Sequence, residues 1–381
     1  MAALDSPMST RLPNEMIEYI AKNLPSPKDL LALRMVCKAW SKEGERQLYA
    51  RRSLTLFQRV GWGLTLDLNT LITVVLDLPS LVSLDISMTI MWDTMTAAKV
   101  SPTLASHISN KLRHLVVHGI SPTDNSGAYH PFQILQLSST WGFVEFGQIS
   151  RPALEDGATG ITELPVVEVE TLRLIGSDNP EAPIWDSPGG DTGARYLPPI
   201  TGLKTFKVAT FNVNDVDGVR RTTIANAGTL KVLSLSVPFY VQTQNLDVDF
   251  LRRATSLRHF ALRIPLFGED SCIAADHFDQ QKWDTFLTTV AFKLPPNLEV
   301  LILYFDFRHK HDETASSAHA RLESHLKFTW KDLGIAVSLC HNLRALKLAI
   351  CCDEGCASPH TWPRHIADNM EAIFFSFPRF Q

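Results

Sequence analysis

Short apolar stretches recur through most of the chain with the pattern apolar-x-x-apolar-x-apolar. Eight units carry this pattern, and they begin at Leu81, Leu112, Val169, Leu203, Leu230, Leu257, Leu298 and Leu343. The second residue is charged in seven of them, although a chain with 20% charged residues would give about one or two by chance. These residues are Arg113, Glu170, Lys204, Lys231, Arg258, Glu299 and Arg344. The pattern predicts short, half-buried strands.

Residues that favour turns stand directly before five of the units, namely Gly202, Thr229, Ser256, Asn297 and Asn342. Between the later units the apolar spacing changes to that of helices. One predicted helix carries Trp283, Phe286, Leu287 and Val290 on a single face, and another carries Leu333, Ala336, Val337 and Cys340. Each of these helices precedes a strand, so the pattern indicates a repeated helix and short strand.

This repetition resembles a leucine-rich-repeat solenoid, in which stacked units bury a continuous core and expose a ladder of strands. The spacing is irregular, because the units start 27 to 57 residues apart and ordinary repeats take about 20 to 29. We expect inserted loops at Ser177–Pro199 and Arg308–His325, and a further unit at Phe132–Leu137 in the longest interval. A single α/β domain with a mostly parallel sheet is the alternative.

The N-terminal segment has a different, helical pattern. Ile17, Ile20, Ala21 and Leu24 share one helix face, Pro13 suits the first turn, and Pro25 ends the helix. Ser26-Pro27-Lys28-Asp29 then supplies the signals that begin a second helix, and the apolar residues after it keep helical spacing as far as Trp40. About forty residues bury too little surface alone, so we expect this segment to pack on a partner.

The order Leu12-Pro13, Glu15, Ile17, Ile20, Leu24, Asp29-Leu30, Leu33-Arg34, Val36-Cys37-Lys38 and Trp40 closely resembles an F-box. The resemblance implies a three-helix F-box at residues 10–52 that binds a Skp-family adaptor, followed by a target-binding domain at 53–381. It also implies an adaptor-facing or module-core set of Leu12, Pro13, Ile17, Ile20, Leu24, Leu30, Val36, Cys37 and Trp40. The alternative is that this segment is the first helical hairpin of a larger domain.

Composition narrows the classes of protein. The 36 basic and 40 acidic side chains give a net charge of -4, which argues against nonspecific nucleic-acid binding. The apolar runs are too short to cross a membrane, and the first residues do not resemble a signal peptide. Six cysteines without a glycosylation sequon fit a reducing compartment. We therefore expect the cytoplasm or the nucleus.

No motif in the chain indicates catalysis. Gly189-Gly190-Asp191-Thr192-Gly193 lacks the Gly-Lys-Ser/Thr of a phosphate-binding loop, and no nucleophile elbow or zinc-protease helix is present. Cys351, Cys352 and Cys356 fit no paired zinc-binding spacing. We predict no catalytic residue, no cofactor and no metal. A hydrolase or transferase on an α/β sheet is the less favoured alternative.

The sequence thus predicts an α/β protein: a three-helix F-box followed by an irregular leucine-rich-repeat-like solenoid. The F-box resemblance implies the substrate-recognition subunit of a Skp-cullin-F-box ubiquitin ligase, or alternatively a scaffold that binds the adaptor without ligase activity. In such a solenoid the concave strand positions are Asp85, His118, Arg173, Lys207, Arg263, Tyr304 and Lys347, and the last five are the predicted target-binding residues. Because four of the seven are Arg or Lys, the predicted target surface is acidic or phosphorylated.

Overall fold

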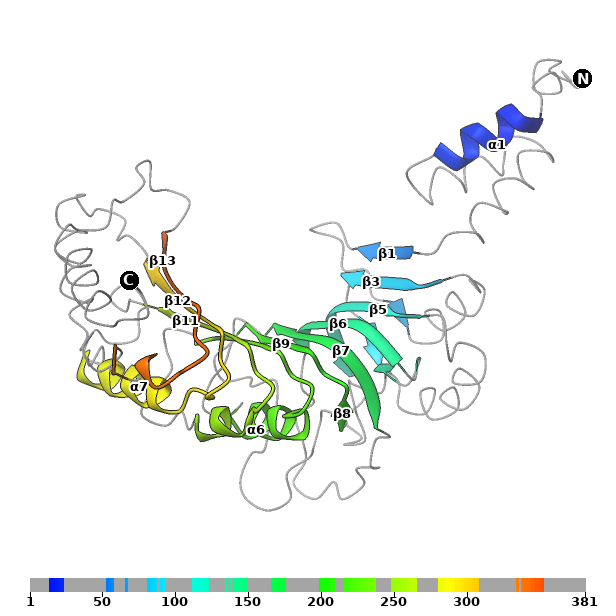
Figure 1. The fold of residues 1–381 in the computed structure, drawn as a ribbon. Helices are drawn as coiled ribbons and strands as arrows, with labels where there is room; N and C mark the ends of the chain where they lie inside the picture. Colours follow the sequence, from blue (N-terminus) through cyan, green and yellow to red (C-terminus); the bar gives the residue numbers. More distant parts are fainter. Residues whose placement is uncertain are drawn as a thin grey trace, which may run out of the picture.

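The computed structural model describes 14–23, 53–57, 66–67, 81–87, 90–92, 112–122, 134–135, 138, 140–149, 166–175, 199–209, 216–237, 248–265, 280–307, 334–335 and 337–352. These residues form an α/β structure built on one strongly curved parallel sheet (Figure 1). None of the described helices is both long and apolar enough to cross a membrane.

Ten strands follow one another across the sheet in chain order. They are β1 (Ser53–Phe57), β3 (Ser83–Ser87), β5 (His114–Pro122), β6 (Thr140–Ile149), β7 (Val167–Ile175), β9 (Thr205–Val208), β10 (Val232–Ser236), β11 (His259–Pro265), β12 (Val300–Phe307) and β13 (Ala345–Cys352). Three short strands pair at the side of this path: β2 (Leu66–Asp67), β4 (Ile90–Trp92) and β8 (Ile200–Thr201). Every pair of neighbouring strands among the described residues is parallel, so each connection must return to the same end of the sheet.

The described helical elements that lie between the later strands, from β9 to β12, are on the convex side of the curve (Figure 1). They are α6 (Val216–Ala225), the 3-10 helix η4 (Asp249–Arg253) and α7 (Gln280–Phe292). Helix α1 (Asn14–Asn23) stands apart, beyond the β1 edge of the sheet (Figure 1). The concave side of the described sheet is therefore the side that these helices do not cover.

The core lies between the sheet and the convex helices and is built of columns of apolar side chains in register. One column contains a residue at 0–1% exposure from each of the eight main-path strands between β3 and β12: Leu84, Leu115, Val144, Leu172, Phe206, Leu233, Phe260 and Leu301. Val219 of α6 and Phe286 of α7 belong to the same buried cluster. The strands thus bury their apolar residues against their neighbours, and α6 and α7 add side chains to the same cluster.

All eight predicted units form strands, and they correspond to β3, β5, β7, β9, β10, β11, β12 and β13. The further unit exists in the longest interval, but its predicted place was wrong. The strand is β6, whereas Ile134 and Leu135 of the predicted segment form a short buried turn ahead of it. Trp141, Val144 and Phe146 carry the apolar pattern of this unit and are at most 2% exposed.

The predicted turns lead into the strands through one repeated arrangement. In most units the backbone carbonyl of the charged second residue accepts two hydrogen bonds from backbone N–H groups of the next unit. The carbonyl of Lys204, for example, accepts from the N–H groups of Lys231 at 2.8 Å and Val232 at 3.0 Å. Gly202 has a φ of 73°, a left-handed conformation that favours glycine in this turn. The repeated bond fixes the register from one unit to the next.

The predicted helix at Trp283–Val290 is confirmed by α7, in which Phe286 and Val290 are buried. Val337 and Cys340 of the second predicted helix are also buried. Of the three predicted F-box helices, α1 is described, and the positions of the other two lie outside the described residues. The two predicted loops lie largely outside them as well: 177–198 and all of 308–325.

Candidate functional site

The concave positions predicted from the sequence lie on neighbouring strands in close register. Arg173 of β7 pairs with Lys207 of β9, and Arg263 of β11 pairs with Tyr304 of β12. Lys347 of β13 is in the same row of residues as Lys207, through Ser234, Ala261 and Ile302. Tyr304 is half-buried and the four basic residues are exposed. The structure therefore brings all five residues to one face.

A carboxylate of the neighbouring strand engages Arg173. Its Nη1 lies 3.1 Å from Oε2 of Glu145, which is 8% exposed, and His118 Nε2 lies 2.9 Å from the other oxygen of that carboxylate. A carboxylate only accepts hydrogen bonds, so His118 holds its proton on Nε2. Sequence reasoning missed Glu145, because its strand was not predicted. The group occupies the β5–β7 part of the face.

The ring of His118 fits here because its register partner is glycine. A Cβ on Gly147 would lie 3.0 Å from Nδ1 of that ring, which is closer than nearly all real Cβ contacts. The side chains of His118, Glu145 and Arg173 thus form a locally satisfied polar group. Such a group contributes to the conformation of the face more than to its net charge.

The charged second residues form a row along the edge where the strands begin. Two ion pairs join members of this row on adjacent strands: Lys204 to Glu170 at 3.0 Å, and Arg258 to Glu299 at 3.4 Å. Arg113 instead donates to the hydroxyl and carbonyl oxygens of Thr140. Exposed pairs of this kind contribute little to stability, typically about 0–1 kcal/mol.

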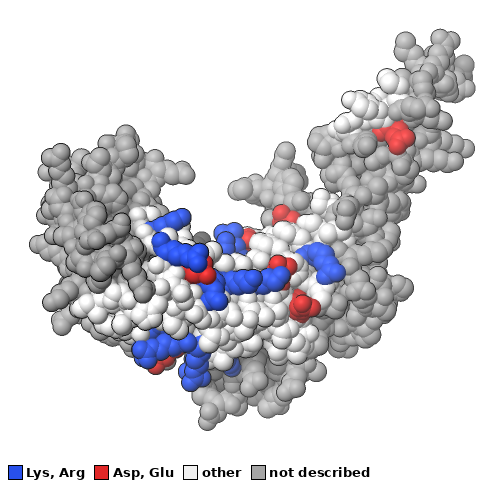
Figure 2. Space-filling model, in the orientation of Figure 1, with Lys and Arg blue, Asp and Glu red and all other residues white. Residues whose placement is uncertain are grey.

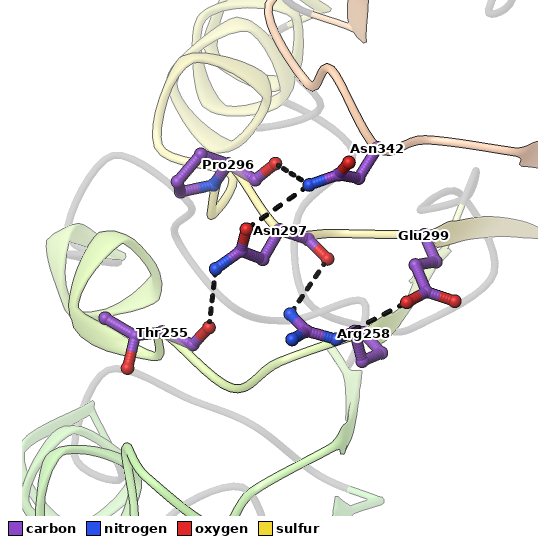
Figure 3. Close-up of polar contacts among 6 residues, drawn as sticks. All are labelled: Thr255, Arg258, Pro296, Asn297, Glu299 and Asn342. Atoms are coloured by element: carbon purple, nitrogen blue, oxygen red, sulfur yellow. Dashed lines mark hydrogen bonds and ion pairs between the residues drawn. The ribbon is translucent and has the colours of Figure 1, made fainter.

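Next to this row the turns are joined by side-chain amides (Figure 3). Asn297 donates through Nδ2 to the carbonyl of Thr255 at 3.1 Å, and Asn342 donates to Oδ1 of Asn297 at 3.3 Å. Arg258 reaches the backbone carbonyl of Asn297 at 3.2 Å, in addition to its ion pair with Glu299. Figure 3 thus shows three successive units linked at the strand-start edge.

Charge on this side of the molecule is unevenly distributed. The strands β9 to β13 with their preceding turns contain two acids, Glu299 and Asp306, and seven bases: Lys204, Lys207, Lys231, Arg258, Arg263, Arg344 and Lys347. The strands β3 to β7 with their preceding turns include the bases Arg113 and Arg173 and the acids Asp85, Glu145, Glu168 and Glu170. Lys and Arg side chains form a band across the face in Figure 2. We call the β9–β13 set the basic half.

Titratable and soft side chains give no sign of a reaction centre in the described part of the chain. No three His, Cys, Asp or Glu among these residues are placed to hold a metal ion. Burial raises the pKa of the Cys340 thiol, which keeps it protonated and a poor nucleophile. Cys356 lies outside the described residues, so the predicted absence of a zinc site there stays a prediction.

Helix α1 presents large apolar side chains to solvent. Met16 is 47% exposed and Tyr19 is 67% exposed, one helical turn apart on the same side. Asn23 continues that side and donates from its side chain to the carbonyl of Tyr19 at 2.7 Å, which satisfies one backbone acceptor near the helix end. An exposed apolar stripe on a short helix indicates a contact surface.

Few of the predicted adaptor-facing residues can be located. Ile20 is half-buried in α1, next to Tyr19, and Ile17 belongs to the same helix. The others lie outside the described residues: Leu12, Pro13, Leu24, Leu30, Val36, Cys37 and Trp40. Their assignment stays a prediction.

Comparison with known proteins gives one positive result. No curated protein matches the chain. The model of the F-box-like family matches residues 9–55, a stretch that includes all of α1 and the first residues of β1. The chain therefore contains an F-box-like domain at its N-terminal end.

Proposed function

We propose that this protein is the target-binding subunit of a Skp-cullin-F-box ubiquitin ligase. The F-box-like domain at residues 9–55 carries the proposal, because F-box domains generally bind Skp-family adaptors. The adaptor connects the chain to a cullin, and the sheet holds a protein target.

The adaptor side is supported by the surface of α1. Met16 and Tyr19 expose apolar surface to solvent, and burying that surface against a partner is energetically favourable. The predicted set from Leu12 to Trp40 completes this surface. A stable complex of this kind buries about 1,200–2,000 Å² in total.

The target side is a leucine-rich-repeat-like solenoid in this proposal. Three observations support it: the strands follow chain order, the carbonyl that accepts two N–H groups recurs at the strand starts, and the buried columns continue from unit to unit. Solenoids of stacked units use their concave surface for binding. The exposed Lys207, Arg263 and Lys347 lie on that surface.

The chain acts by proximity and performs no bond chemistry itself. Holding the adaptor at one end and a target on the sheet keeps a target lysine near the ubiquitin-conjugating enzyme and raises its effective concentration. The components of such a ligase are found in the cytoplasm or nucleus, where we place the protein.

Co-expression of the full chain with a Skp-family adaptor, followed by addition of a cullin and size-exclusion chromatography, tests the proposal. We expect one peak that contains all three proteins. A complex with the adaptor that excludes the cullin would instead identify a scaffold without ligase activity. A chain that elutes alone beside free adaptor would contradict the proposal altogether.

A further inference from the structure

We infer that the basic half binds an extended acidic segment of a protein, which crosses the concave face from β9 to β13. This inference rests on the proposed function only in calling that segment the target. It concerns which part of the face binds and what spacing of charges it recognises.

The first observation is the contrast between the two halves. In β5–β7, Glu145 already neutralises Arg173, whereas Lys207 and Lys347 make no ion pair with any described residue. The chain as a whole has a net charge of -4, so a region with two acids and seven bases is a local departure from its composition. A local excess of positive charge favours an acidic partner and speeds its association.

The second observation is the spacing of the concave bases. Lys207, Arg263 and Lys347 lie on alternate strands. Arg263 is two residues beyond Ala261, the residue of β11 that lies in the row of Lys207 and Lys347. Strands about 4.8 Å apart and a rise of about 3.3 Å per residue separate Lys207 from Arg263 by about 10–12 Å. An extended segment covers that distance in three to four residues, so its acids should recur at that interval.

The third observation is the small size of most residues in the two rows that hold these bases. Ser234 and Ala261 lie in the row of Lys207 and Lys347, and Ser236 and Ala349 lie in the row of Arg263; Ile302 and Tyr304 are the larger members. Small side chains let the main chain of a bound segment approach the sheet. Tyr304, between Arg263 and Ala349 in register, offers a hydroxyl that can donate to a carboxylate or phosphate oxygen. The surface therefore suits a peptide better than a bulky folded domain.

Fluorescence anisotropy of the full chain with labelled peptides tests the inference. One peptide has Glu at every third position among Gly and Ser, and a second has the same composition with all Glu residues together. We expect the spaced peptide to bind more tightly, and its affinity to fall with added salt because the contacts are exposed ion pairs. A third peptide with phosphoserine in place of Glu shows which anion binds better, and binding of either supports the inference.

The site variant Lys207→Glu/Arg263→Glu/Lys347→Glu should bind the spaced peptide on the order of 100-fold more weakly, because three attractions become repulsions. The matched control, Arg220→Glu/Arg221→Glu/Arg253→Glu, makes the same change in net charge on the exposed convex elements α6 and η4 and should bind like the wild type. Glutamine at the three concave positions gives a milder variant, expected to lose affinity by about 10-fold.

Three results would overturn the inference: no binding of the spaced peptide at low salt, an equal loss in the convex control, or tighter binding of a single-stranded oligonucleotide of equal charge. The last would assign the face to nucleic acid. None of these measurements involves the adaptor, so a failure here leaves the proposed ligase role to its own test.

Discussion

Replacing Asn226 with Ala is expected to lower the free energy of unfolding by about 3 kcal/mol, the largest stability effect of a single polar substitution that we predict. Asn226 is 2% exposed and follows the last turn of α6. Its Nδ2 donates to the carbonyls of Ile200 at 2.8 Å and Thr222 at 2.9 Å, and its Oδ1 accepts from the N–H of Leu203 at 3.0 Å. The side chain thus joins the helix to the β8–β9 turn.

Alanine leaves the buried N–H of Leu203 and the carbonyl of Ile200 without this partner, and each unpaired buried group costs about 1–3 kcal/mol. Urea unfolding followed by circular dichroism measures the loss. Asn297→Ala is the matched control, because its hydrogen bonds to Thr255 and Asn342 are exposed, and it should cost less than about 1 kcal/mol. Equal losses in the two variants would mean that Asn226 does not hold the helix to the sheet.

The second large effect concerns the adaptor. The variant Leu12→Ala/Pro13→Ala/Trp40→Ala should bind a Skp-family adaptor at least ~100-fold more weakly than the wild type, because a few buried apolar and aromatic anchors dominate most protein interfaces. Titration calorimetry with purified adaptor measures the difference.

Two controls make that result interpretable. Lys231→Ala/Arg344→Ala changes exposed residues of the strand-start edge and should bind the adaptor like the wild type. The thermal unfolding of the sheet should be the same in all three proteins, which shows that the triple variant has lost a contact and kept its fold. Unchanged adaptor affinity in the triple variant would remove these residues from the interface.

The sequence predicted the described strands well because each unit carries its own signal. A buried Leu column alternates with charged residues, and turn residues such as Asn297 and Asn342 precede the strands. The strand at Thr140–Ile149 was placed wrongly because its unit begins with tryptophan, whereas the pattern was counted on Leu, Val, Ile and Phe. Trp141, Val144 and Phe146 have the same spacing, so counting Trp as apolar would have found it.

The polar contacts of the face could not be predicted in the same way. The ion pair of Arg173 with Glu145 depends on the register of β6 against β7, which follows from how the two units stack. Alternation along a strand says which side a residue faces, but it does not say which residue of the next strand lies beside it. Alternation thus predicted Lys207, Arg263 and Lys347 on one side, but the contact of Arg173 with Glu145 became visible only when the strands were placed next to one another.

The central claim is that one chain holds an adaptor and an acidic segment at the same time, and sedimentation velocity of the labelled spaced peptide tests it most directly. With both the adaptor and the full chain present, we predict that the peptide sediments with the complex of all three. With the adaptor alone it should stay at the meniscus. A peptide that leaves the chain when the adaptor binds, or never sediments with it, would contradict the account.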